Sequence, residues 1–230
     1  MTTFSAEAEI SRLTSIAKLR KEEAKDFRDD GEIKSAIQAL EDAIAALDQS
    51  PLSNRLLETD APSGPQKKLA FQLADCLGML GGNYRRLNQF SEALAAFTRG
   101  RAIEESEKLE VPSSYNLVNA ITLPLEIDGQ ISQQEAALER AIAAIERQVK
   151  LEERRTDRWA WADLGECQLL LGDLEAAKTS YKRVLELGNA DTFASVVTVL
   201  RRLLKVLESD PKATGALKQG IQWVESGASS

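Results

Sequence analysis

The residue types that most often carry catalysis are scarce in this sequence. It has no histidine and two cysteines, Cys76 and Cys167, which lie far apart in the chain. Without histidine, Ser-His-Asp relays, Cys-His relays and histidine-ligated metal sites are all excluded. Two cysteines are too few for a four-thiolate zinc site, and their apolar, helical surroundings favour buried side chains. The sequence therefore predicts no catalytic residues and no metal site.

Adjacent carboxylates are the remaining residues that could do acid–base chemistry. They occur as three pairs: Glu22-Glu23, Glu104-Glu105 and Glu152-Glu153. Acid–base catalysis also needs a pocket that positions such groups, and no pattern indicates one, so the pairs are interpreted as solvated helix faces. The phosphate-binding patterns GxGxxG and GxxxxGK followed by Ser or Thr are absent. We expect a protein that is not an enzyme and binds no cofactor.

Charge and hydropathy narrow the possible partners. The net charge of -7 argues against nucleic acid, whose binding depends on surplus Lys and Arg. The longest apolar runs, such as VVTVL at 196–200, are far shorter than the roughly 20 residues of a membrane-spanning helix. The N-terminal stretch MTTFSAEAEISRL has no export pattern. We expect a cytoplasmic protein that binds neither nucleic acid nor membrane.

Apolar residues recur with helical spacing along most of the sequence, so helices would position any binding residues. Between residues 35 and 47, apolar side chains recur every three or four positions and form one stripe on a helix: Ala36, Ile37, Leu40, Ala43, Ile44 and Leu47. No segment alternates convincingly at period two. The sequence therefore predicts an all-α protein.

Turn signals divide the helices into hairpins. Asp and Gly residues at 29–31, 128–129 and 172–173 indicate tight turns between neighbouring helices. The Pro-rich stretch QSPLSNRLLETDAPSGP at 49–65 is expected to be an irregular loop with a short turn around Leu56. We expect a single domain of about five antiparallel hairpins, at about 5–48, 66–109, 113–153, 157–188 and 190–226.

Two of these hairpins share a motif. In WADLGECQLLLGDLEAAKTSYKRV, residues 161–184, the motif residues are Trp161, Leu164, Gly165, Ala177 and Tyr181. A second copy has Leu77, Leu80, Gly81, Tyr84, Ala93 and Phe97, and a weaker third has Ala24, Phe27, Ala36 and Leu40. These residues resemble the pattern W-x2-L-G-x2-Y and then A-x3-F of the tetratricopeptide repeat family. The resemblance is clear over 74–107 and 158–190 and looser over 16–50, and Gln168 replaces the motif's tyrosine.

The motif has a physical reason. A small residue on the first helix lets the second helix approach, and an aromatic residue on the second fills the space between this hairpin and the next. The resemblance implies a right-handed α-solenoid whose concave groove is lined by the first helix of each hairpin. The last hairpin, 190–226, lacks the motif and is interpreted as a terminal cap.

The resemblance also implies which residues contact a partner in that groove. The candidates on the first helices are Lys25, Met79, Gly82, Arg85, Arg86, Trp159 and Glu166. One subgroup of the family clamps the C-terminal carboxylate of chaperones with lysines and asparagines. Lys25 and Met79 stand at two of the asparagine positions, so a chaperone-tail adaptor is disfavoured. Trp159 either anchors a partner or packs between repeats, and Trp161, at the packing position, is interpreted as core.

Asn116 and Asn119 are candidates for a different reason. They lie three positions apart, so they share one face of a helix, where asparagine is a poor helix former. An amide can pair with the backbone of a bound peptide, a role that the resemblance supports. The alternative is that Asn116 satisfies the helix start, with Ser113 or Ser114 as cap, and that Asn119 bonds a neighbouring helix.

The sequence thus predicts a non-catalytic scaffold, an adaptor or regulatory subunit that binds a peptide or helix of another protein in its groove. A second hypothesis is a self-associating structural or sensing module, a homo-oligomer that gates a separate effector enzyme. An enzyme with a carboxylate or tyrosine site is the third and least favoured class.

Overall fold

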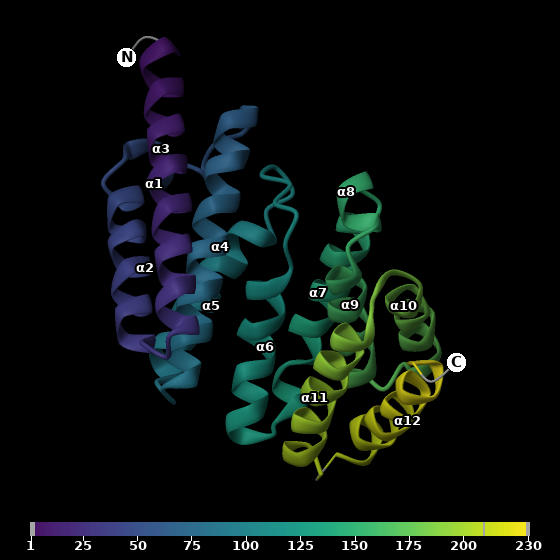
Figure 1. Ribbon diagram of the computed structural model, residues 1–230. Coiled ribbons are helices and arrows are strands. Elements are labelled where there is room, and N and C mark those ends of the chain that lie inside the picture. The colour runs from purple at the N-terminus through teal and green to yellow at the C-terminus, as the bar shows by residue number, and fades with distance from the viewer. Residues whose placement is uncertain (1–2, 209, 229–230) are drawn as a thin grey trace. The chain divides into compact units, whose positions relative to one another are not determined.

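The computed structural model describes residues 3–208 and 210–228, and every regular element in those ranges is a helix (Figure 1). The long helices are α1 Thr3–Asp29, α2 Ile33–Asp48, α4 Gly64–Arg86, α5 Phe90–Glu104, α6 Tyr115–Asp128, α7 Glu135–Gln148, α9 Arg158–Leu170, α10 Leu174–Leu187, α11 Ala190–Val206 and α12 Pro211–Ala228. Three short turns separate some of them: α3 Pro51–Asn54, η1 Ile131–Gln133 and α8 Glu152–Arg155. The predicted all-α class is confirmed for these residues.

The chain divides into two compact units, Met1–Leu117 and Val118–Ser230, and the division falls within α6. In unit 1, α1 pairs with α2 and α4 pairs with α5. The first helix of the second hairpin, α4, also packs against both helices of the first. In unit 2, α9 pairs with α10 and α11 pairs with α12. A single domain over the whole chain stays a prediction.

The hairpin turns follow from backbone conformation. Gly31 lies between α1 and α2 with φ 83°, and Gly172 lies between α9 and α10 with φ 78°. Both values belong to the left-handed region, where glycine has no steric penalty. The turn between α4 and α5 has the same geometry at Asn88, with φ 58°, because asparagine is among the few other residues that tolerate it. These turns fix the antiparallel pairing.

The amphipathic stripe expected at 35–47 forms the buried side of α2, and all of its apolar residues are buried. The stretch 49–63 is irregular except for α3, where the Ser50 hydroxyl accepts a hydrogen bond from the Leu52 amide, and α4 already begins at Gly64. Leu56, 2% exposed, packs into the core of unit 1. Burial of an apolar side chain therefore holds this irregular stretch in place, as it does the helices.

The motif residues make a close contact inside each hairpin. A Cβ built on Gly81 would lie 2.6 Å from the Phe97 ring, and one built on Gly165 would lie 2.7 Å from the Tyr181 ring. Both aromatic rings are buried. The aromatic residue of the second helix thus rests directly on the glycine of the first, so that the absence of a side chain sets how closely the two helices pack.

The last hairpin packs in the opposite order to the second. Its second helix, α12, contacts both α9 and α10, whereas α11 contacts α10 much less than α12 does. A Cβ on Gly220 would lie 2.6 Å from Leu169 of α9, and one on Gly227 would lie 2.4 Å from Leu185 of α10. Two glycines of α12 therefore provide the close approach to the preceding hairpin.

Candidate functional site

The Asn116 side chain is buried in unit 1, with only 1% of its surface exposed. Its Nδ2 donates hydrogen bonds to the Ala74 carbonyl oxygen and to Glu104 Oε1, each at 2.8 Å. A Cβ on Gly100 would lie 2.3 Å from the Asn116 amide, so this glycine makes room for it. Asn116 therefore joins the start of α6 to α4 and α5, and its predicted role in partner binding stays untested.

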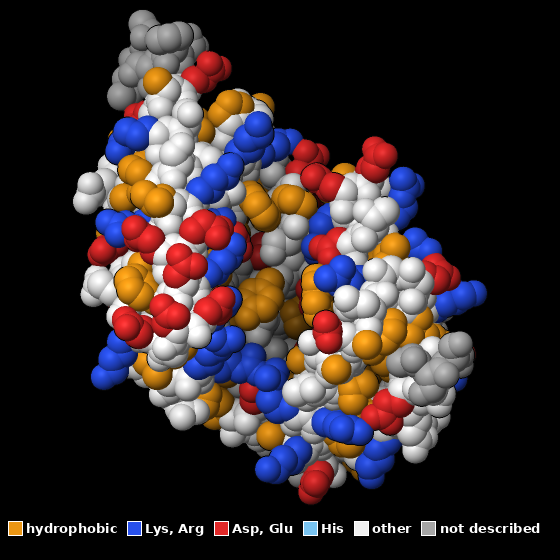
Figure 2. Space-filling model, viewed as in Figure 1, with side chains coloured by type: hydrophobic (Ala, Val, Ile, Leu, Met, Phe, Trp, Pro, Cys, Tyr) orange, Lys and Arg blue, Asp and Glu red, His pale blue; other side chains and the backbone are white. Residues whose placement is uncertain are grey.

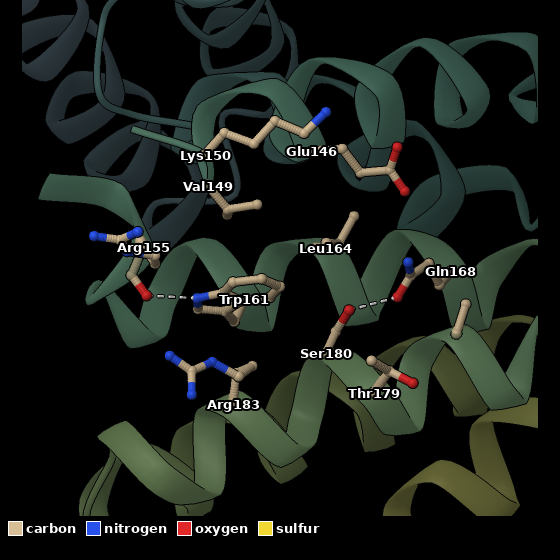
Figure 3. A pocket seen from close by; sticks show the side chains of 11 residues that line it. Glu146, Val149, Lys150, Arg155, Trp161, Leu164, Gln168, Thr179, Ser180 and Arg183 are labelled. Carbon is tan, nitrogen blue, oxygen red and sulfur yellow. Dashed lines mark hydrogen bonds between the residues drawn. The ribbon is translucent and has the colours of Figure 1, made fainter. Parts of the chain in front are cut away.

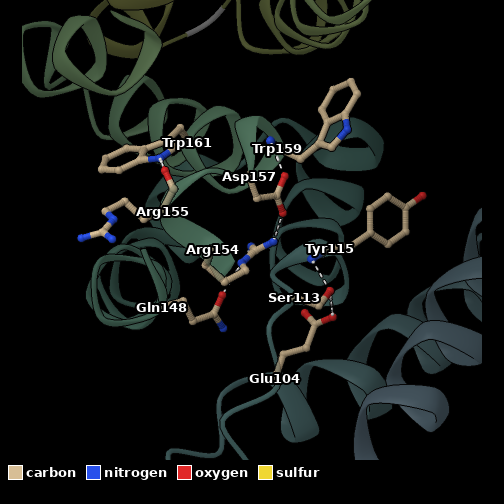
Figure 4. Close-up of polar contacts among 9 residues, drawn as sticks. All are labelled: Glu104, Ser113, Tyr115, Gln148, Arg154, Arg155, Asp157, Trp159 and Trp161. Carbon is tan, nitrogen blue, oxygen red and sulfur yellow. Dashed lines mark hydrogen bonds and ion pairs between the residues drawn. The ribbon is translucent and has the colours of Figure 1, made fainter. Parts of the chain in front are cut away.

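Glu104 shows why α6 begins where it does. Its carboxylate accepts hydrogen bonds from Ser113 Oγ at 2.7 Å and from the Leu117 backbone N–H at 2.8 Å (Figure 4). Burial raises the pKa of Glu104 above its ordinary value, although these hydrogen bonds act to lower it. The interpretation of Glu104 as part of a solvated face is wrong, because this carboxylate satisfies amide donors at a helix start.

Tyr115, at the start of α6, is an exposed aromatic residue of unit 1. Its side chain is 48% exposed, and its ring meets Phe97 edge-on with centroids 5.9 Å apart. A Cβ on Gly78 would lie 2.9 Å from Tyr115 Cδ1, and one on Gly82 would lie 3.3 Å from its hydroxyl. Two glycines one turn apart on α4 thus form a seat for the tyrosine. The sequence analysis missed Tyr115, and the signal was an aromatic residue at the start of a first helix.

The other predicted residues of α4 lie around this seat. Met79 and Arg85 are half-buried, Gly82 is half-buried beside Tyr115, and Arg86 is exposed. We name Met79, Gly82, Arg86 and Tyr115 the Tyr115 face. It combines an aromatic ring, a flexible apolar side chain, open backbone and a cation.

Lys25, the candidate on α1, and its neighbour Lys21 both form ion pairs within the chain. Lys21 is buried and forms an ion pair with Asp75, and its amine lies 6.0 Å from the Phe71 ring centroid. Lys25 pairs with Glu22 at 2.7 Å. Figure 2 likewise shows acidic and basic side chains interleaved over α1 and α2. The positive charges of Lys21 and Lys25 are therefore largely neutralised within the chain.

The remaining predicted residues belong to unit 2. Trp159 is 43% exposed, and the Arg158 guanidinium lies 5.5 Å from its ring centroid. The Asp157 carboxylate accepts a hydrogen bond from the Trp159 backbone N–H at 2.9 Å and so caps α9. Asn119 and Glu166 are half-buried. A partner-binding role for these residues stays a prediction.

Unit 2 contains a pocket of about 760 Å³ between α7, α9 and α10 (Figure 3). We name it the α7–α10 pocket; its wall includes Val149, Lys150, Arg155, Trp161, Gln168 and Arg183. Trp161 Nε1 donates to the Arg155 carbonyl oxygen at 2.9 Å, and Ser180 Oγ donates to Gln168 Oε1 at 2.7 Å. Trp161, which was interpreted as core, is half-buried and lines this pocket with part of its indole. Gln168 is shorter than the motif's tyrosine and fills less of the space.

Both cysteines are buried, as predicted, and burial raises the pKa of Cys76 to about 12. In the described part of the chain, no three His, Cys, Asp or Glu side chains are grouped as metal ligands. Among the helices at 3–208 and 210–228, none has the length and apolarity needed to cross a bilayer.

Residues 160–190 match the family model of the tetratricopeptide repeat. No curated protein matches the chain. Similar solved structures include BtubC from P. vanneervenii, at 14% identity over 99% of this chain and 90% of that one, with a TM-score of 0.47. A putative kinesin light chain of Podosopora anserina is similar at 15% identity over 96% and 98%, with a TM-score of 0.45. A tetratricopeptide repeat protein from Parabacteroides merdae ATCC 43184 is similar at 17% identity over 93% and 71%, with a TM-score of 0.44.

These structures are too distant to indicate more than a general likeness. The segment 160–190 coincides with the hairpin of α9 and α10, where Gly165 lies against Tyr181. The motif predicted at 158–190 is therefore confirmed as one tetratricopeptide repeat, over residues 160–190.

Proposed function

We propose that this protein is a non-catalytic scaffold that binds a peptide or helix of another protein through the Tyr115 face. Tetratricopeptide repeats are protein-interaction scaffolds in general, and this proposal assigns the role to one surface. The observation that carries it is the half-exposed Tyr115 ring on its seat of Gly78 and Gly82. A cytoplasmic location stays a prediction.

The chemistry of this face suits a protein partner. Tyrosine is enriched at binding hot spots, since it offers a large rigid contact area together with a polar hydroxyl. Phe97 holds the ring edge-on, which reduces the entropy lost when a partner orders it. Met79 adapts to irregular apolar surfaces, and Arg86 adds a charge at the rim. The Gly82 backbone has no side chain to keep a partner away.

The test compares Tyr115→Ser with wild type in capture of partners by the purified protein, followed by affinity measurement on the captured partner. We expect Tyr115→Ser to weaken binding about tenfold, which corresponds to about 1.4 kcal/mol. Leu57→Ser is the matched control, because Leu57 is 49% exposed in the irregular stretch 49–63, outside the Tyr115 face. A partner bound equally well by Tyr115→Ser and wild type would contradict the proposal.

Self-association is the second candidate, as a homo-oligomer that gates a separate effector enzyme. It is supported by Leu19 on α1, an apolar side chain 62% exposed. In this case Leu19→Glu would convert an oligomer into a monomer in sedimentation experiments. A wild-type protein that stays monomeric at high concentration would remove this candidate.

A further inference from the structure

The α7–α10 pocket has a charge unlike that of the whole chain. Three cationic side chains line it, Lys150, Arg155 and Arg183, against one carboxylate, Glu146. Arg183 pairs with Glu186, whereas no carboxylate of the described chain pairs with Lys150 or Arg155. The whole chain carries a net charge of -7. A cationic pocket on an acidic protein is a local feature that attracts anionic groups.

The floor of the pocket is apolar and fixed. Hydrogen bonding to the Arg155 carbonyl oxygen holds the Trp161 ring in place, and the Arg183 guanidinium lies 5.7 Å from its centroid. Leu164 and Val149 extend the apolar surface beside the indole. Since the indole N–H already has an acceptor, the exposed part of the ring offers contact area for an apolar group.

Gln168 supplies an unused donor. Its side chain is only 6% exposed, and its Oε1 accepts the hydrogen bond from Ser180. Its Nε2 has no acceptor in the described chain, although an amide nitrogen carries two donors. Such a donor at the wall of a pocket suits a carbonyl oxygen of a ligand.

The charges are arranged along the pocket. Figure 3 shows Arg155 and Arg183 toward one end and Glu146 with Gln168 toward the other, and the Lys150 ammonium extends toward Glu146. A ligand with negative charge throughout would meet Glu146, so a polyphosphate fits poorly. A peptide fits better, because carboxylates, an apolar side chain and backbone carbonyls occur in one chain.

We propose that the α7–α10 pocket is a second binding site, which takes an acidic protein segment carrying a bulky apolar side chain. The apolar side chain packs on Trp161 and Leu164. The carboxylates pair with Lys150 and Arg155, and a backbone carbonyl accepts from Gln168 Nε2. This site is lined by residues of unit 2, shares no residue with the Tyr115 face, and does not depend on the function proposed for that face.

The fluorescence of Trp161 can report whether a ligand occupies the pocket. The sequence has three tryptophans, so Trp159→Phe with Trp223→Phe leaves Trp161 as the single fluorophore. The probe is a short blocked peptide of alternating leucine and aspartate. Two comparison peptides replace leucine by serine or aspartate by lysine. We expect the leucine–aspartate peptide to change Trp161 emission with saturation, and each comparison peptide to bind at least about tenfold more weakly.

Charge reversals at the pocket test the proposed pairing. In the same background, Lys150→Glu and Arg155→Glu should each weaken the peptide about tenfold. Lys182→Glu is the matched control, because Lys182 is exposed on α10 and does not line the pocket. Tyr115→Ser should leave the Trp161 response unchanged, so that failure here and failure of the Tyr115 face are distinguishable.

Three results would overturn the proposal. The first is an emission that does not saturate with the leucine–aspartate peptide. The second is an equal loss of affinity for Lys182→Glu and Lys150→Glu, which would indicate attraction to overall charge. The third is equal or tighter binding of inorganic phosphate or ATP, which would indicate a general anion site.

Discussion

At the scale of single residues, Tyr181 carries an unsatisfied polar group. Its side chain is 1% exposed, and its hydroxyl has no hydrogen-bond partner in the described chain. Burial, with the nearby Glu166 carboxylate, raises the pKa of Tyr181 well above its ordinary value. Phe97 occupies the corresponding motif position in the other hairpin without a hydroxyl. The Tyr181 ring therefore contributes packing, while its hydroxyl costs free energy.

We predict that Tyr181→Phe stabilises the protein by about 1 kcal/mol, because it removes a buried hydroxyl that gains no hydrogen bond. Urea unfolding followed by circular dichroism measures the change. Tyr84→Phe is the control, since the Tyr84 hydroxyl donates to Glu41 and its removal should not stabilise. A lower midpoint for Tyr181→Phe would mean that the hydroxyl has a favourable interaction.

Sequence reasoning at this scale identified unusual residues better than it identified their roles. Asn116 was correctly singled out as a poor helix former. Its partners, Ala74 and Glu104, lie on two other helices, so their hydrogen bonds could not be read from helical periodicity. The same limit applies to Trp161, whose exposure depends on the space left by Gln168 and on the position of Arg155.

At the scale of helices, the glycine–aromatic contact decides how each motif hairpin packs. We predict that Gly165→Ala and Gly81→Ala each destabilise the protein by about 1 to 3 kcal/mol. The added methyl would lie 2.7 Å from the Tyr181 ring or 2.6 Å from the Phe97 ring, and these buried, rigid rings have little room to move. Thermal and urea unfolding measure both variants.

Gly215→Ala is the matched control for this substitution. A Cβ on Gly215 would have no heavy atom within 4 Å, and the residue lies within α12. Alanine should therefore raise stability by up to about 1 kcal/mol through helix propensity alone. Loss of stability at Gly81 and Gly165 together with a gain at Gly215 would show that close packing, not helix propensity, causes the loss. A loss of stability at all three positions would contradict this explanation.

The helices and their turns were largely predictable, because periodicity and turn glycines are local signals. The turn at Asn88 was not singled out, since asparagine adopts left-handed geometry less distinctively than glycine. The packing order of the last hairpin was also unpredictable from the motif, which 190–226 lacks. The residues that could have indicated this packing order are Gly220 and Gly227 on α12, which lie at the contacts with α9 and α10.

At the scale of the whole molecule, the division within α6 raises the question of whether the two units unfold together. In repeat proteins each hairpin contacts mainly its neighbours, so a local change need not spread along the chain. Gly81 lies in unit 1 and Gly165 in unit 2, at the same position of their motifs. The two alanine variants therefore apply one perturbation to each unit.

We predict that Gly81→Ala increases amide hydrogen exchange mainly in α1, α2, α4 and α5, and that Gly165→Ala does so mainly in α7, α9, α10 and α12. The reason is that each substitution weakens packing within one unit, and local opening reports local stability. Hydrogen exchange followed by mass spectrometry measures both patterns. Equal increases in both units for either variant would contradict this prediction. Stability would then be shared through α6, and a ligand on the Tyr115 face would also protect the α7–α10 pocket from exchange.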